Sequence, residues 1–295
     1  MTARLRGLPT LSIVLPCLDE ADRLPGTLAA YLAHFPPSRS EVELIVVDDG
    51  SSDGTTVIAD QIAAADPRVL VVRTTRNHGK GYAVRTGVQA AQGELVVFTD
   101  ADGSYGPEQL EKVVAALRQA PVAIGARLDP QSSGGSPLLR RLASPVFNRA
   151  MRLLLGLPYA DTQCGLKGFR RDAAEALFSR ARVDGFAFDA EALLVAARLG
   201  LEVVEVPVVA EDRQGSKVRL GGDALRMLAD VWKVRRAAAA GAYDETRVRD
   251  LADRGRRGAG GAGGASVSSS SISATDPSAS DRAAARSGDR NTNRL

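Results

Sequence analysis

An apolar, β-branched run that ends in two acidic residues constrains this chain more than any other stretch. Residues 94–99 read ELVVFT, and such runs are typical of strands that are covered on both faces of a parallel sheet. Asp100 and Asp102 follow at once, and Pro107 stands where a helix would begin. The sequence therefore predicts a buried strand with two carboxylates at its carboxyl end, where open α/β sheets bind ligands.

Asp100 and Asp102 are one residue apart, and two carboxylates so close repel each other unless a cation shares them. Mg²⁺ binds one or two carboxylates together with phosphate oxygens of a substrate and water. We therefore expect Mg²⁺ or Mn²⁺ at this pair. The alternative is a polar turn that only caps the helix at Pro107.

Apolar runs and helical patterns alternate along the first part of the chain. This alternation predicts an α/β fold with a mostly parallel, Rossmann-like sheet flanked by helices. Ser52 or Asp53 is expected to cap the second helix. This second helix carries Val57, Ile58, Ile62 and Ala65. Strands are predicted at 11–15, 42–47, 69–72, 94–99 and 122–125, the other helices at 19–35, 82–91, 107–119, 137–159, 189–199 and 223–240, and an apolar run at 201–209.

Amino-acid composition limits the kinds of molecule that the protein can be expected to bind. The 38 Lys and Arg against 35 Asp and Glu leave a net charge of +3, which is too small to indicate nucleic acid, and 4% aromatic residues provide no platform for stacking bases. We expect no nucleic-acid partner. Cys17 and Cys164 are too few for a disulfide framework or a zinc site, and we expect them to be packing residues.

Nothing in the sequence predicts a membrane span, which needs roughly 18 apolar residues in a row. We therefore expect a cytoplasmic protein. From about residue 255 the chain is Gly, Ala, Ser and Arg without periodicity, which predicts a disordered, dispensable tail. The expected division is a folded domain at 1–242 and a linker with the disordered tail at 243–295.

Four short motifs occur in a fixed order, and three of them directly follow a predicted strand. They are SIVLPCLDE at 12–20, VVDDGSSDGT at 46–55, RNHGKG at 76–81 and TDADGS at 99–104. Together they resemble the GT-A glycosyltransferases of family 2, over roughly residues 10–235. The stretch DTQCGLKGF at 161–169 is similar to the dolichyl-phosphate glucosyltransferase branch, with dolichyl-phosphate mannose synthases a close second.

The resemblance implies an inverting, metal-dependent transfer of a hexose from a nucleotide diphosphate sugar to polyprenyl or dolichyl phosphate. UDP-glucose is favoured over GDP-mannose as the donor. Helix capping is the alternative for the acidic residues at 48–53. The donor-binding residues that the resemblance implies are Pro16, Asp19, Glu20, Asp48, Asp49, Lys80, Asp100 and Ala101.

The resemblance places Asp102, Asp161 and Gln163 near the reacting sugar as catalytic residues. Basic side chains of the lipid-phosphate branch grip the acceptor phosphate, and guanidinium groups suit that task through paired hydrogen bonds. The matching residues are Arg127, Arg213, Ser216 and Lys217. A solvated charge is the alternative for Arg127, and a turn residue is the alternative for Asp161.

Four arginines, at 140, 141, 149 and 152, lie beside a Leu-rich side of the helix predicted at 137–159. We expect this helix to contact anionic lipid at the cytoplasmic face of a membrane, and the alternative is a helix that packs on the core. A membrane-protein partner is also possible. Because Gln-x-x-Arg-Trp is missing, the sequence does not resemble processive polysaccharide synthases.

Two other functions remain open from the sequence. The same donor half could serve transfer to a sugar or a small metabolite. A nucleotide-sugar-binding module without chemistry is the alternative outside enzymology, although the intact acidic motifs argue against it.

Overall fold

A computed structural model of the chain describes residues 10–36, 41–128, 148–149, 151–211 and 222–244. Contacts between residues divide the chain into a unit Met1–Ala252 and a unit Asp253–Leu295. The second unit, which holds the predicted tail, lies outside the described residues.

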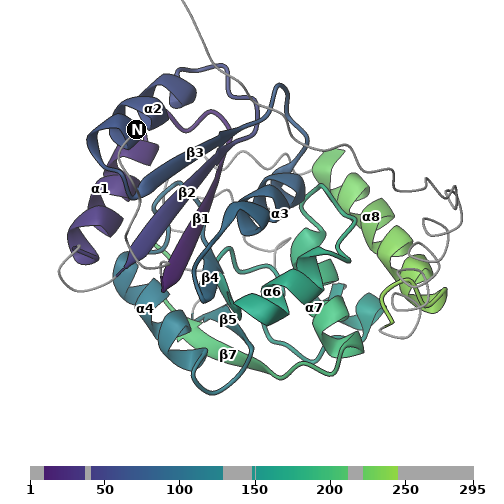
Figure 1. Cartoon of the computed structure of the whole chain (residues 1–295). Coiled ribbons are helices and arrows are strands. Elements are labelled where there is room, and N and C mark those ends of the chain that lie inside the picture. The colour runs from purple at the N-terminus through teal and green to yellow at the C-terminus, as the bar shows by residue number, and fades with distance from the viewer. Residues whose placement is uncertain (1–9, 37–40, 129–147, 150, 212–221, 245–295) are drawn as a thin grey trace, which may run out of the picture. The chain divides into compact units, whose positions relative to one another are not determined.

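The first unit is built on a seven-stranded sheet with the strand order β3-β2-β1-β4-β6-β5-β7. Neighbouring strands run parallel, except that β6 is antiparallel to both β4 and β5. The expected α/β fold with a mostly parallel sheet is confirmed (Figure 1). The strands are β1 (Leu11–Cys17), β2 (Val42–Asp48), β3 (Val69–Arg73), β4 (Leu95–Phe98), β5 (Val122–Arg127), β6 (Lys167–Arg170) and β7 (Val203–Val208).

Helices cover both faces of this sheet, and the side chains of its inner strands alternate between two apolar clusters. On β1, Val14 belongs to one cluster and Ile13 and Leu15 to the other. Burial on both faces explains why these strands read as unbroken apolar runs. The helices are α1 (Leu24–His34), α2 (Thr55–Ala65), α3 (Lys80–Ala90), α4 (Pro107–Ala116), α6 (Arg171–Phe178), α7 (Phe188–Arg198) and α8 (Gly222–Ala239).

β6 and the helix α6 that follows it were not predicted from the sequence. β6 has only four residues, KGFR, and neither an apolar run nor a clear alternation marks it. Its place between β4 and β5 is stabilised by ladder hydrogen bonds on both sides. Tertiary pairing therefore creates a strand where local propensity is weak.

Two predicted helices begin or end elsewhere than expected. Neither Ser52 nor Asp53 is the N-cap residue of α2, because Gly54 stands there with φ 97°. Of the two, Asp53 still contributes to the start of the helix, since its carboxylate accepts the Thr55 N–H at 3.0 Å. Within the helix predicted at 137–159, the described residues 148–149 and 151–155 are helical, and the helix stops at Gly156, where φ is 66°. Most of that helix, including two of its four arginines, lies outside the described residues.

Close packing of α3 on the sheet requires a glycine at position 87. A Cβ there would lie 2.3 Å from Cγ1 of Val14 and 2.9 Å from Cγ2 of Val47. We predict that Gly87→Ala lowers the free energy of unfolding by about 1–3 kcal/mol through overpacking.

The matched control is Gly26→Ala in α1, where an added Cβ meets nothing within 4 Å. It should stabilise the protein by about 0.5–1 kcal/mol, as expected for Gly to Ala in a helix. Urea unfolding of both variants measures the difference. Equal effects would contradict the packing described for α3.

Candidate active site

The loops that follow β1 and β2 hold each other at the carboxyl edge of the sheet. Asp19 adopts a positive φ of 52°, and its carboxylate accepts the Ser52 N–H at 2.7 Å. The Glu20 N–H donates to the Thr55 hydroxyl at 2.7 Å. The predicted residues Asp19 and Glu20 are therefore brought against the second acidic motif, and Pro16 lies within β1 itself.

Asp48 and Asp49 are buried, and their carboxylates organise the loops around them. Asp48 accepts the Ser51 N–H at 2.9 Å. Asp49 reaches a different loop, where it accepts the Gly79 N–H at 2.7 Å and the His78 N–H at 3.0 Å. Asp49 thus joins the end of β2 to the Gly-rich loop, RNHGKG at 76–81.

The Gly-rich loop packs directly on backbone from a distant part of the chain. Asp184 accepts the N–H groups of Gly81 and Tyr82 at 2.7 and 3.2 Å. A Cβ on Gly79 would lie 2.4 Å from the Asp184 carbonyl oxygen, and one on Gly81 would lie 2.4 Å from that of Val183. Both glycines are needed for this close approach, which places Lys80 between them.

Lys80 reaches the Asp-x-Asp motif. Its Nζ lies 2.5 Å from Oδ1 of Asp100. Burial would lower the pKa of Lys80, but the carboxylates of Asp100 and Asp189 raise it above its usual range. The lysine therefore stays charged beside the motif.

The loop that follows β4 and carries Asp100 and Asp102 is anchored on α1. The Asp102 carboxylate accepts the Ser104 N–H at 2.9 Å, and the Thr27 hydroxyl donates to the Ala101 carbonyl at 2.9 Å. The Tyr31 hydroxyl donates to the Tyr105 carbonyl at 2.8 Å. Ala101 is therefore held through its backbone.

Gly165 touches Asp100 from the other side, and sequence reasoning missed it as a site residue. A Cβ on Gly165 would lie 2.1 Å from Oδ2 of Asp100. Phe98 pairs with Lys167 in the antiparallel β4–β6 ladder, and the same register continued by two residues sets Asp100 opposite Gly165. The sequence feature that could have indicated this role is the Cys-Gly pair within the motif at 161–169.

Arg127 and Asp161, predicted for two different tasks, form one ion pair. The Arg127 Nε and Nη2 atoms lie 2.6 and 3.1 Å from the two carboxylate oxygens of Asp161. Burial alone would raise the pKa of Asp161, but Arg127 holds it below its usual range. Asp161 also accepts the Gln163 N–H at 3.1 Å. The other predicted acceptor residues, Arg213, Ser216 and Lys217, lie outside the described residues.

A buried ion pair between Lys167 and Asp189, near Asp100, was also not predicted from the sequence. Lys167 is 0% exposed, and its Nζ lies 2.7 Å from Oδ1 of Asp189. The sequence feature that could have indicated this pair is Lys167 itself, a lysine among the non-polar residues at 165–169. Cys17 and Cys164 are buried as expected of packing residues, and burial raises the pKa of the Cys164 thiol.

The donor set at Asp100 and Asp102 suits a hard divalent cation. Within the described part of the chain, no group of three or more His, Cys, Asp or Glu side chains could enclose a metal. Two carboxylates at the end of a strand, open to a substrate, are what Mg²⁺ or Mn²⁺ needs when phosphate oxygens and water complete its ligands.

Comparisons with known proteins identify the family of this chain. The family model described as glycosyl transferase family 2 matches residues 12–178. A dolichyl-phosphate β-glucosyltransferase of Trichomonas vaginalis is 32% identical, over 81% of this chain and 76% of its own length. A polyprenol monophosphomannose synthase of Mycolicibacterium smegmatis is 32% identical, over 83% of this chain and 93% of its own length.

A solved structure shares the fold. Glucosyl-3-phosphoglycerate synthase of Mycobacterium tuberculosis, in complex with Mn²⁺, UDP-glucose and phosphoglyceric acid, is 25% identical with a TM-score of 0.57. The alignment covers 77% of this chain and 80% of that one. The fold and site thus define a glycosyltransferase of the GT-A class. More narrowly, the chain belongs to glycosyltransferase family 2.

We predict that Asp49→Asn loosens the Gly-rich loop. An amide has one acceptor oxygen instead of two, so its NH₂ group would face the N–H of His78 or Gly79. Hydrogen exchange at these two amides should become faster, and the affinity for UDP should fall several-fold.

The control for this variant is Asp60→Asn on α2, since Asp60 is an exposed carboxylate paired with Arg73. Exchange at His78 and Gly79 should not change there. Unaltered exchange in Asp49→Asn would show that the loop does not depend on this carboxylate.

Proposed function

We propose that this protein transfers a hexose from a nucleotide diphosphate sugar to polyprenyl phosphate. The observation that carries the proposal is the cluster of Asp100, Asp102 and Lys80 where β4 ends, since it combines two metal-binding carboxylates with a fixed cation. The names of the similar proteins support a lipid phosphate as acceptor.

UDP-glucose is the favoured donor. The Trichomonas vaginalis relative is named as a glucosyltransferase, and the structural neighbour was solved with UDP-glucose. GDP-mannose is the alternative, which the mannosyl-transferring relatives from Mycolicibacterium smegmatis and Micrococcus luteus support. Asp19, Glu20, Asp48 and Asp49 line or shape the donor loops in this proposal.

Charge placement explains how these residues would act. Asp100 and Asp102 would hold a divalent ion that, when bound, neutralises the leaving diphosphate. Lys80 adds a cation beside it, and Arg127, oriented by Asp161, would face the acceptor phosphate. A phosphate monoester has a second pKa of about 6, so the acceptor is already a good nucleophile at neutral pH. Positioning and electrostatic stabilisation then account for catalysis.

The test is transfer of radiolabelled hexose from UDP-glucose and from GDP-mannose to polyprenyl phosphate, with and without EDTA. Transfer should require Mg²⁺ or Mn²⁺, and Asp102→Asn should lower turnover by orders of magnitude. Glu108→Gln, which alters an acid that is 68% exposed on α4, is the control and should keep full activity.

Two results would contradict the proposal. Full activity of Asp102→Asn in EDTA would remove the metal assignment. Transfer to phosphoglyceric acid or a free sugar, with none to the lipid, would establish a small-molecule acceptor instead.

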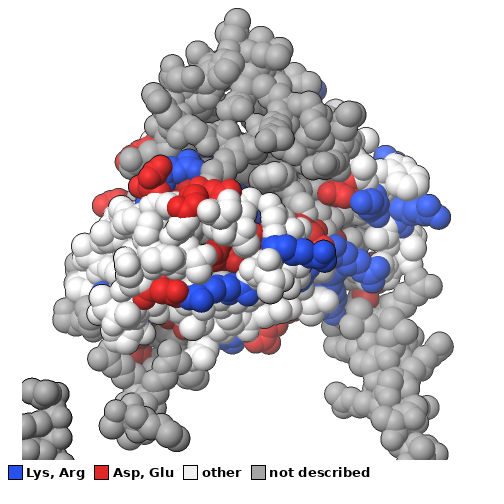
Figure 2. Space-filling view, turned by 90° about the horizontal axis from the view of Figure 1, so that it is seen from above, with Lys and Arg blue, Asp and Glu red and all other residues white. Residues whose placement is uncertain are grey.

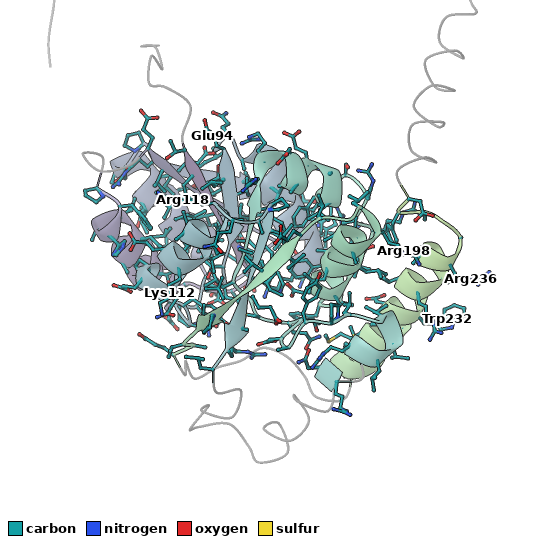
Figure 3. All side chains as sticks on the ribbon, turned by 90° about the horizontal axis from the view of Figure 1, so that it is seen from below. Glu94, Lys112, Arg118, Arg198, Trp232 and Arg236 are labelled. Atoms are coloured by element: carbon teal, nitrogen blue, oxygen red, sulfur yellow. The ribbon has the colours of Figure 1, made fainter. Side chains whose placement is uncertain are left out.

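We further propose that the protein contacts an anionic membrane surface peripherally, through α8. No helix in the described ranges is long and apolar enough to cross a membrane. The outer face of α8 carries Trp232, which is 62% exposed, with Arg235 and Arg236 beside it. Figure 3 shows Trp232 and Arg236 pointing away from the sheet, and basic side chains gather toward the α8 side in Figure 2. A tryptophan among cations on one helix face suits the interface of an anionic bilayer.

The triple variant Trp232→Ala, Arg235→Glu, Arg236→Glu should lose salt-sensitive binding to vesicles that contain phosphatidylserine, measured by co-sedimentation. Lys112→Glu with Arg118→Glu, on and just after α4 (Figure 3), makes the same change in net charge. This control should still bind. Equal binding by both variants would contradict a role for α8.

The extent of the catalytic domain is a further part of the proposal. Tyr243 is buried, and its hydroxyl donates to Glu191 on α7 at 2.7 Å. Asp244 pairs with Arg198 at 3.6 Å. We therefore place the end of the catalytic domain beyond residue 242, between these contacts and the tail that begins near residue 255.

A further inference from the structure

The buried Lys167–Asp189 pair has no place in the reaction as described so far. Lys167 comes from β6 and Asp189 from the first turn of α7. Besides Asp189, the Lys167 ammonium group donates to the Cys164 carbonyl at 2.6 Å. Its Nζ also lies 5.7 Å from the centre of the Phe98 ring, on the neighbouring strand β4.

Stability alone is a poor reason for such a pair. Removing two charges from water is costly, and apolar residues of similar volume in place of a buried ion pair often leave a protein equally or more stable. Lys167 and Asp189 are 0% and 5% exposed. The pair therefore calls for a second explanation, and its neighbours provide one.

One connection runs through the backbone. Lys167 holds the carbonyl of Cys164, and the next residue, Gly165, has its Cα against the Asp100 carboxylate, where even a Cβ would lie 2.1 Å from Oδ2. Without the hydrogen bond from Lys167 to this carbonyl, the backbone at Gly165 would be free to move. Asp100 would then lose its contact with Gly165. Lys167 thus controls a contact of Asp100 that it does not itself make.

The second connection runs through charge. Lys80 lies 2.5 Å from Asp100, and its Nζ is 6.0 Å from the ring centre of Phe188, the residue next to Asp189. The negative charge of Asp189 acts on Lys80, as does that of Asp100. Negative and positive groups alternate along the row Asp100, Lys80, Asp189 and Lys167.

We propose that Lys167 and Asp189 are positioning residues that fix Asp100 in the orientation that binds the divalent ion. This inference rests on the proposed function, because it concerns the metal that the function requires. Neither residue touches the reacting atoms. They act through Gly165 on one side of Asp100 and through Lys80 on the other.

The test separates positioning from stability with the double variant Lys167→Met, Asp189→Leu. Because both charges leave together, the fold should keep a melting temperature near that of the wild type. Binding of Mn²⁺ in the presence of UDP, measured from the electron paramagnetic resonance signal of free Mn²⁺, should weaken at least tenfold. A tenfold loss corresponds to about 1.4 kcal/mol.

A second variant covers the case in which the double variant does not fold. Asp189→Asn keeps an acceptor for Lys167 but leaves its ammonium group without a counter-charge, so it should lower the melting temperature and weaken Mn²⁺ binding by a smaller factor than the double variant. Glu43→Gln is the control for general destabilisation, because Glu43 is a buried carboxylate at the far end of β2 that accepts the Ser12 hydroxyl at 2.6 Å. It should lower the melting temperature without changing Mn²⁺ affinity.

The outcomes are distinct. Wild-type Mn²⁺ affinity in a folded double variant, or equal loss in Asp189→Asn and Glu43→Gln, overturns the inference and leaves the proposed function intact. A wild-type protein that does not bind Mn²⁺ with UDP overturns the proposed function, and the inference falls with it. A double variant that melts near the wild-type temperature but binds Mn²⁺ at least tenfold more weakly supports positioning.

Discussion

The close contact between Gly165 and Asp100 is the constraint on which the rest of the site depends. It exists because β6 runs against its neighbours in an otherwise parallel sheet, so the segment entering β6 meets the residues leaving β4. The same insertion brings Asp161 to Arg127 at the end of β5. One short antiparallel strand therefore joins Asp100, after β4, to Arg127 at the end of β5.

Carboxylates that accept backbone N–H groups shape the rim of the site, in addition to those that would bind ligands. Asp19 and Asp49 accept backbone N–H groups from loops more than 25 positions away in the sequence. Each such contact removes freedom from two loops at once, so the loops meet a substrate with little further ordering. Carboxylates buried with complete hydrogen bonding also rigidify their surroundings.

The strands β1, β2 and β4 were predictable because burial on both faces leaves an unbroken apolar run in the sequence. The acidic residues after them could be placed at one edge for the same reason. β6 could not be predicted, since its stability comes from partners on β4 that are 69–75 positions away and partners on β5 that are 43–47 positions away. The roles of Gly165 and Asp189 depend on contacts between distant segments, and no local pattern encodes these.

The contact between α3 and Asp184 changes how the site can recognise a diphosphate. Folds that bind dinucleotides set a phosphate at the start of a helix, where free N–H groups and the helix dipole attract it. Here a protein carbonyl already accepts the N–H groups of Gly81 and Tyr82, and Asp49 accepts that of Gly79. These N–H groups at the start of α3 therefore already have protein acceptors and are not available to a phosphate. Side-chain cations and a metal must balance the negative charge of a bound nucleotide instead.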